Sequence, residues 1–180
     1  MRELSFFLSN YFLFLAATAL LASLECSLWL QVFGNSPGPH LWIPTLVFWS
    51  LYRRSEEGVA MVYILTLILA SLSAVNKSLF LLINTSLFGV LLLLKQRVHT
   101  SGALNFMLTC GVVSFVFPLL HMGYSWIFEN NPVNNLSWFD WILEPLLTML
   151  TTLPLYPVFR IFDRITHKQL PTEMEDLGYE

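Results

Sequence analysis

Long apolar runs separated by short polar loops make up almost the whole chain. Six such runs follow one another, at about 5–30, 40–52, 58–75, 79–94, 103–128 and 138–165. Most of them are long enough for a helix that crosses about 30 Å of hydrocarbon. The pattern therefore predicts an all-α, polytopic membrane helix bundle with about six transmembrane helices. We expect the first run to be an uncleaved span, because it is longer than the apolar part of a typical signal peptide.

The second run, His40–Tyr52, is the ambiguous one. As a helix it would reach only about 20 Å, at 1.5 Å per residue, and it contains Pro44. It is therefore either a crossing in a thinned membrane or a re-entrant segment. In the first case the chain has six spans, and in the second case five.

Charge distribution favours the six-span topology. Only 12% of the residues are charged, whereas a soluble domain has about a quarter. With six spans and the N-terminus inside, Lys77 is the one basic residue outside, and the other eight of the nine lysines and arginines lie on the cytoplasmic side. This matches the excess of lysine and arginine in cytoplasmic loops. In the five-span topology Arg2 joins Lys77 outside, and the C-terminus remains cytoplasmic.

From this topology we predict one membrane domain at 1–168 and a flexible, acidic cytoplasmic tail at 169–180. The residues expected to anchor the cytoplasmic helix ends are basic, namely Arg53, Arg54, Lys95, Arg97, Arg160 and Arg164.

Polar residues recur along the last run at intervals of four. They are Asp140, Glu144, Thr148 and Thr152. Residues at i and i+4 share one helix face, so the stripe is expected to face protein rather than lipid. It is interpreted first as a polar seam between helices, with a ligand or ion site and a subunit contact as alternatives.

Four prolines are candidate helix bends, namely Pro118, Pro145, Pro154 and Pro157. The threonine hydroxyls of the stripe are expected to hydrogen-bond carbonyls that Pro154 and Pro157 leave unpaired.

Other polar residues inside the runs are weaker candidates. Glu25 has either a structural hydrogen-bonding role or a role with a partner or a proton, since intramembrane acids are costly. His121 is expected to be a core residue rather than a ligand. Cys26 and Cys110 are expected to be buried thiols. Asn76, Asn84 and Asn135 begin N-x-[ST] triplets that we interpret as chance occurrences.

The sequence contains no Walker loop, GxSxG elbow, HExxH or GxGxxG motif, and no cysteine or histidine pair at metal-ligand spacing. We therefore expect no catalysis, no cofactor, no metal and no nucleic-acid partner.

Two stretches resemble the bacterial rod shape-determining protein MreD family. One is the aromatic-centred run that ends in a basic turn, 39–54, and the other is the apolar-aromatic-proline step followed by basic residues, 155–164. The resemblance covers roughly residues 33–166. The chain departs from the family at Ala70, near the position where many members carry an aspartate, so no role of that acid is carried over.

This resemblance implies a non-enzymatic inner-membrane protein of the cell-wall elongation complex. Its expected partners are MreC and, through the complex, MreB and the peptidoglycan polymerase and transpeptidase. The spans also resemble the six-helix substrate-binding subunits of energy-coupling-factor transporters. The alternative function is therefore a small-molecule-binding membrane subunit of a vitamin-type transporter, with a pocket lined by Glu25, Asp140 or Glu144.

Overall fold

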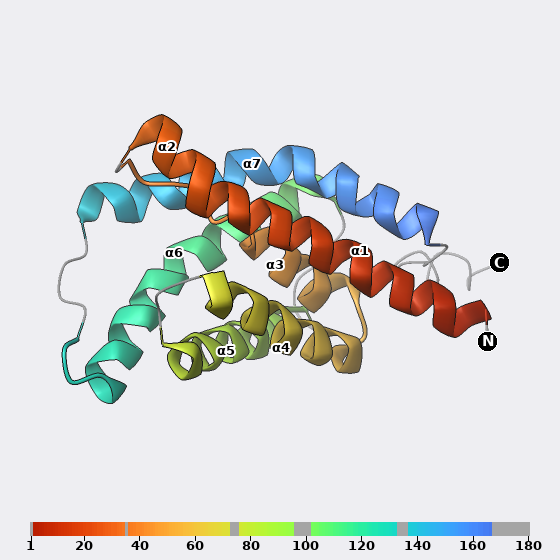
Figure 1. Ribbon diagram of the computed structural model, residues 1–180, viewed down its shortest axis with the longest axis horizontal. Helices are drawn as coiled ribbons and strands as arrows, with labels where there is room; N and C mark the ends of the chain where they lie inside the picture. The colour runs from red at the N-terminus through yellow and green to blue at the C-terminus, as the bar shows by residue number, and fades with distance from the viewer. Residues whose placement is uncertain (1, 35, 73–75, 96–101, 133–136, 167–180) are drawn as a thin grey trace.

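The computed structural model describes residues 2–34, 36–72, 76–95, 102–132 and 137–166, and all of its regular elements are helical. Side chains are described from Leu8 onward, except those of residues 28 and 30. In chain order the elements are α1 (Arg2–Leu24), the π-helical turn η1 (Glu25–Trp29), α2 (Leu30–Phe33), α3 (Ile43–Tyr52), α4 (Ser55–Leu72), α5 (Lys77–Lys95), α6 (Ala103–Phe128) and α7 (Trp138–Ile165). The predicted all-α helix bundle is confirmed (Figure 1).

Five helical segments of the described chain are long and apolar enough to cross a membrane: 8–33, α4, α5, α6 and α7. Their outward faces are apolar as well as their buried ones; Leu20, Leu93 and Leu150 are each more than 60% exposed. A helix that is apolar all round is either enclosed by protein or surrounded by lipid. These helices are those of a multi-pass membrane protein.

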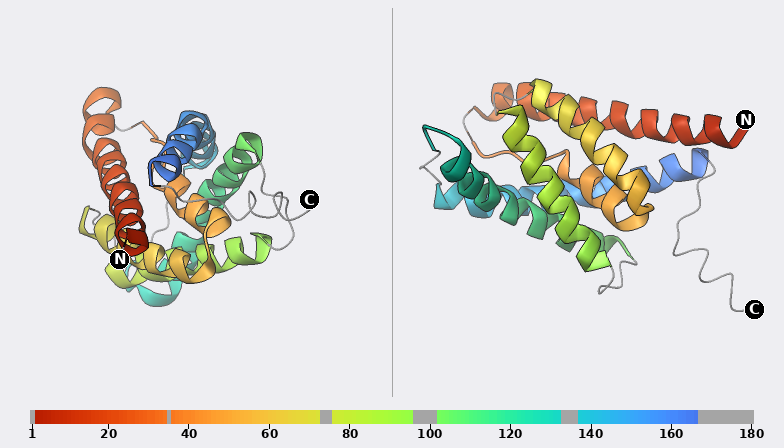
Figure 2. Two further views of the ribbon diagram at one scale, coloured as in Figure 1. Left: turned by 90° about the vertical axis from the view of Figure 1, so that its right-hand side faces the viewer. Right: turned by 90° about the horizontal axis from the view of Figure 1, so that it is seen from below.

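The short helix α3 lies at the centre of the bundle (Figures 1 and 2). All ten of its residues are buried, which explains why its sequence shows no polar face. With ten residues it is shorter than a full span, as expected for this run, and whether residues 40–52 cross the membrane stays a prediction. The non-helical stretch before it and α3 together lead the chain from α2 to the start of α4.

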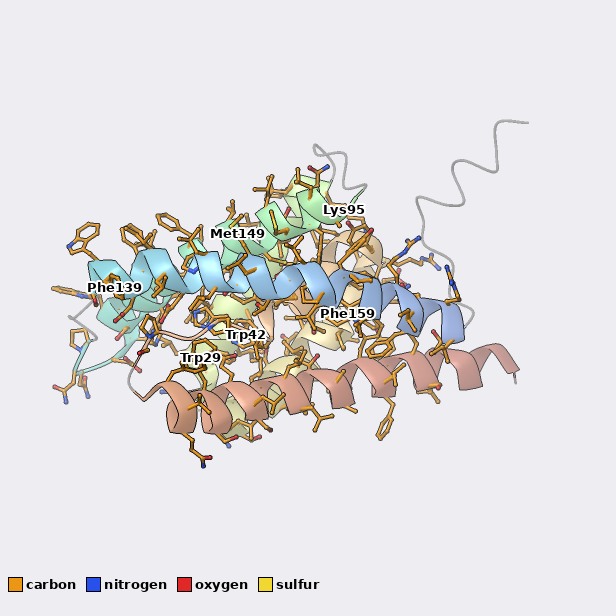
Figure 3. All side chains as sticks on the ribbon, turned by 90° about the horizontal axis from the view of Figure 1, so that it is seen from above. Trp29, Trp42, Lys95, Phe139, Met149 and Phe159 are labelled. Atoms are coloured by element: carbon orange, nitrogen blue, oxygen red, sulfur yellow. The ribbon has the colours of Figure 1, made fainter. Side chains whose placement is uncertain are left out.

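Aromatic side chains fill the space between α3 and its neighbours. Phe48 of α3 lies 5.5 Å from Phe14 of α1 and 5.3 Å from Phe159 of α7, measured between ring centroids. All three rings are fully buried. Figure 3 shows Phe159 inside the bundle between α1 and α7, whereas Phe139 stands at the start of α7. These rings fill the space between α1, α3 and α7.

Two glycines permit close helix contacts. A Cβ on Gly58 of α4 would lie 2.8 Å from the Phe88 ring of α5, and one on Gly111 of α6 would lie 2.5 Å from Met149 of α7. Small residues at helix interfaces let backbones approach closely in membranes. The α4–α5 and α6–α7 pairs each have such a glycine at their contact.

Both ends of the described chain lie at one end of the bundle (Figure 1). The same end holds the side chains of Arg53, Arg54, Lys95, Arg160 and Arg164, of which Lys95 donates a 2.5 Å hydrogen bond to the Arg53 carbonyl oxygen. We call it the basic end. Lys77 begins α5 at the opposite end. Arg97 and the acidic tail lie outside the described residues.

Candidate functional site

Acidic residues of η1 and α7 converge on a histidine that precedes α3. His40 Nδ1 lies 3.4 Å from Glu25 Oε1, and His40 Nε2 lies 3.5 Å from Glu144 Oε2. Glu25 also accepts a 2.9 Å hydrogen bond from the Leu41 amide. We call Glu25, His40 and Glu144 the acid–histidine cluster. It joins η1, the stretch before α3, and α7.

The two carboxyl groups constrain the protonation of His40. A neutral imidazole has one N–H donor and one bare nitrogen, and a bare nitrogen facing a carboxylate would be repelled by it. Both ring nitrogens of His40 face carboxylates, so the arrangement favours the imidazolium form. The cluster thus places two acidic side chains around one histidine.

Of the two buried threonines in the α7 stripe, Thr148 contacts the cluster directly. Thr148 is fully buried, and its hydroxyl oxygen accepts a 3.0 Å hydrogen bond from the His40 amide. The same oxygen lies 3.2 Å from Ser114 Oγ of α6. Thr152, also fully buried, follows one turn later. The stripe therefore faces protein at both threonines and connects α7 to α6 and to the start of α3.

Asp140, the first residue of the stripe, is only partly buried, and no described hydrogen bond joins it to the cluster. Its neighbour Trp138 is 74% exposed, whereas Trp141 stacks on Phe115 of α6 with ring centroids 4.4 Å apart.

The expected link between threonines and prolines needs correction. The Thr151 hydroxyl donates to the carbonyls of Leu147 and Thr148, and the Thr152 hydroxyl donates to that of Thr148. The missing amides of Pro154 and Pro157 affect the carbonyls of Leu150 and Leu153 instead. Pro145, Pro154 and Pro157 lie within one uninterrupted helix, as does Pro118 in α6. That these prolines bend their helices stays a prediction.

A second polar cluster lies at the basic end. Arg53 Nη2 donates hydrogen bonds to Asp163 Oδ1 and to Asn10 Oδ1, the latter at 3.3 Å. Asn10 Nδ2 in turn donates to Asp163 Oδ1 at 3.2 Å. Arg53 and Asp163 are 1% and 4% exposed. The Arg53 side chain is thus buried within the bundle, and its expected role as a cytoplasmic anchor stays a prediction.

Aromatic rings enclose the Arg53 guanidinium. Its central carbon lies 5.2 Å from the Trp49 ring centroid and 5.7 Å from that of Phe48. Within the described part of the chain, its Nε and Nη1 have no hydrogen-bond partner. The rings supply cation–π contacts in place of further acceptors.

A cavity of about 170 Å³ opens beside the acid–histidine cluster. Its walls come from η1 and five neighbouring segments, and its lining residues are Ala22, Glu25, Cys26, His40, Trp42, Leu69, Leu72, Phe80, Phe117 and His121. Cys110 is buried as expected, but Cys26 is exposed, which corrects that expectation. No three histidine, cysteine or acidic side chains among the described residues are placed to hold a metal ion.

Sequence reasoning missed three of these features. His40 was treated only as the start of an apolar run, although a histidine among apolar residues was a usable signal. Asp163 falls between Arg160 and Arg164 and was hidden by the basic pattern around it. The π-helical turn at Glu25 has no sequence signature, yet such turns within α-helices are frequent at functional sites.

Compared with models of known protein families, curated protein sequences and solved structures, the chain matches none.

Proposed function

We propose that this protein is a non-enzymatic scaffold of the cell-wall elongation complex in a bacterial inner membrane. The observation that carries the proposal is the contact between the two stretches that resemble the MreD family. The first contains Arg53 and the second contains Asp163, and these residues form the buried ion pair. The resemblance thus rests on one packed unit rather than on two unrelated fragments.

The positive-inside rule supports an orientation for this scaffold. Five basic residues of the described chain gather at the basic end, and Lys77 is at the other. We propose that the basic end, with the beginning of α1, is cytoplasmic.

A groove between α1 and α4 offers a surface for a partner helix. It has a volume of about 620 Å³ and is lined by Leu8, Tyr11, Phe12, Leu15, Glu56, Glu57, Ala60 and Ile64. Most of this lining is apolar, and Phe12 is 76% exposed. Ala60 is small and exposed, and small residues permit close helix approach in a membrane.

Charge complementarity supports the choice of occupant that we propose. Glu56 is an exposed acid in the first turn of α4, at the basic end of the groove. The positive-inside rule places lysine or arginine at the cytoplasmic end of a partner's transmembrane helix, next to this carboxylate. We therefore propose that the groove holds the membrane-spanning helix of the MreC partner.

Filling the groove should release this partner. The substitution Ala60→Phe is expected to lower co-purification of the full-length chain with MreC by at least about tenfold, or about 1.4 kcal/mol. Val90→Phe on α5 adds a phenylalanine at a site that is 53% exposed and outside the groove, and it should leave co-purification unchanged. Undiminished co-purification by folded Ala60→Phe protein would show that lipid, not this partner, fills the groove.

The cavity beside Glu25 and His40 favours a second candidate, a small-molecule-binding membrane subunit. Its volume of about 170 Å³ is below the roughly 300–1,000 Å³ of pockets for drug-sized ligands. A vitamin-sized ligand does not fit this volume, so the scaffold is the function that the geometry supports better.

A further inference from the structure

The cavity beside the acid–histidine cluster is sized for a very small molecule. A cavity of about 150 Å³ accommodates benzene, and this one measures about 170 Å³. Its occupant would therefore have about six to eight non-hydrogen atoms. The cavity lies where η1, α4, α5 and α6 approach the stretch before α3, and Figure 3 shows Trp42 in this interior region.

The charge around the cavity selects a cation. Glu25 lines it directly, and its side chain is 20% exposed. His40 also lines it, and its two ring nitrogens face the carboxyl groups of Glu25 and Glu144, so two acidic side chains stand against one histidine. His121, on the opposite wall, contributes a ring that lies parallel to Phe117 within 13°. The excess of acidic side chains over histidine in this cluster favours a cation over an anion.

The aromatic wall distinguishes an organic cation from a metal ion. Trp42, Phe80 and Phe117 form a mutual ring cluster, with Trp42 5.6 Å from Phe80 and 5.3 Å from Phe117 between centroids. Aromatic rings attract ammonium groups through their quadrupoles, and aromatic walls are a recurring means of recognising quaternary ammonium. A metal ion would instead need several oxygen, nitrogen or sulfur donors that point to one position. The described lining residues do not provide such a group of donors.

We propose that this cavity binds the ammonium group of a small amine or of an amine-bearing lipid headgroup. Glu25 supplies the countercharge, and Trp42, Phe80 and Phe117 supply the aromatic wall. This proposal is independent of the scaffold function. It gives a ligand class to the second candidate function, because a headgroup-sized cation fits where a vitamin does not.

Cys26 provides a reporter of occupancy. It is exposed and lines the cavity, whereas Cys110 is buried. In the full-length protein in detergent, alkylation of Cys26 by N-ethylmaleimide is followed by mass spectrometry with choline as the probe. Alkylation should slow about tenfold when choline is at about ten times its Kd, because only the unoccupied fraction reacts. The control is 3,3-dimethylbutan-1-ol, which has the same shape without the charge and should not protect.

Two variants test whether choline protects Cys26 from alkylation by binding in the cavity. Glu25→Gln should abolish it, measured as the ratio of rates with and without choline, while Asp140→Asn should retain it. Continued resistance of Cys110 to alkylation shows that each variant is folded.

A lipid arm distinguishes the two ligand sources. Protection in nanodiscs of phosphatidylethanolamine and phosphatidylglycerol, compared with phosphatidylglycerol alone, would identify a lipid headgroup. Protection by choline in detergent without such a lipid effect would identify a free amine. The proposal is overturned if neither arm protects Cys26, if the neutral alcohol protects equally, or if folded Glu25→Gln keeps the protection. None of these outcomes bears on binding of MreC to the α1–α4 groove.

Discussion

Replacing Asp163 with alanine is expected to destabilise the protein by about 3–5 kcal/mol, because it leaves the Arg53 guanidinium buried without its countercharge. Arg53 is 1% exposed, so water cannot solvate its guanidinium in place of the lost carboxylate. Asn10 can still accept one hydrogen bond from Nη2, at 3.3 Å, but an amide carries no charge. The free energy of unfolding of the full-length protein, measured by denaturant titration in detergent micelles, checks this value.

Two further variants show whether the loss of stability comes from the broken ion pair or from any substitution in this part of α7. Arg164→Ala, one residue away on the exposed side of the helix, should change stability by less than about 0.5 kcal/mol. The double variant with Arg53→Met and Asp163→Leu should recover most of the loss, since apolar replacement of a whole buried pair is often neutral or stabilising. A loss below about 1 kcal/mol for Asp163→Ala would mean that the pair behaves like a surface pair, contrary to its burial.

Truncating the central aromatic ring should also be costly. Phe48→Ala is expected to destabilise the protein by about 3 kcal/mol, the lower end of the usual range for buried phenylalanine. The lower end applies because lipid is as apolar as the protein interior, so the loss comes from packing rather than from transfer out of water. Phe48 is fully buried between Phe14, Phe106 and Phe159, and the empty volume would lie in the middle of the bundle. The same denaturant titration measures the change.

Phe139→Ala is the matched control for this truncation. Phe139 is 67% exposed at the start of α7, so its loss leaves no internal void and should cost less than about 0.5 kcal/mol. Equal effects of the two substitutions would contradict the placement of α3 at the centre of the bundle.

The long helices could be predicted from the sequence because each is an apolar run bounded by polar residues. The runs at 103–128 and 138–165 became α6 and α7 with the same bounds. The third run illustrates a limit: α4 begins at Ser55, ahead of the expected start at Gly58, because Ser55, Glu56 and Glu57 form its polar first turn. Hydropathy alone does not reveal a polar first turn.

The short α3 shows why burial was harder to predict than helicity. An apolar run of 10 to 14 residues fits a buried core helix, a re-entrant segment or an incomplete span equally well. Its complete enclosure depends on helices far away in the sequence. The Thr18–Thr45 contact at 2.8 Å joins α1 to α3 in this way.

The candidate site was predicted in part. The stripe Glu144–Thr148–Thr152 was visible from its four-residue spacing, and Glu25 stood out as an acid in an apolar run. Their meeting at His40 was not visible, because it brings together residues 15 and 104 positions from the histidine. Arg53 was predicted from local charge to be a cytoplasmic anchor, and its pairing with Asp163, 110 positions away, was not visible in the sequence. Local pattern identifies polar residues, and tertiary packing decides their partners.

The proposed role in cell-wall elongation is tested most directly by depleting the protein in the bacterium that encodes it and imaging cell shape. The account predicts that rods lose their shape and become round as wall insertion loses its organisation. Re-expression of the unaltered chain or of Val90→Phe should restore rods, and Ala60→Phe should not. Depleted cells that remain rods with normal incorporation of wall precursors would contradict the scaffold function.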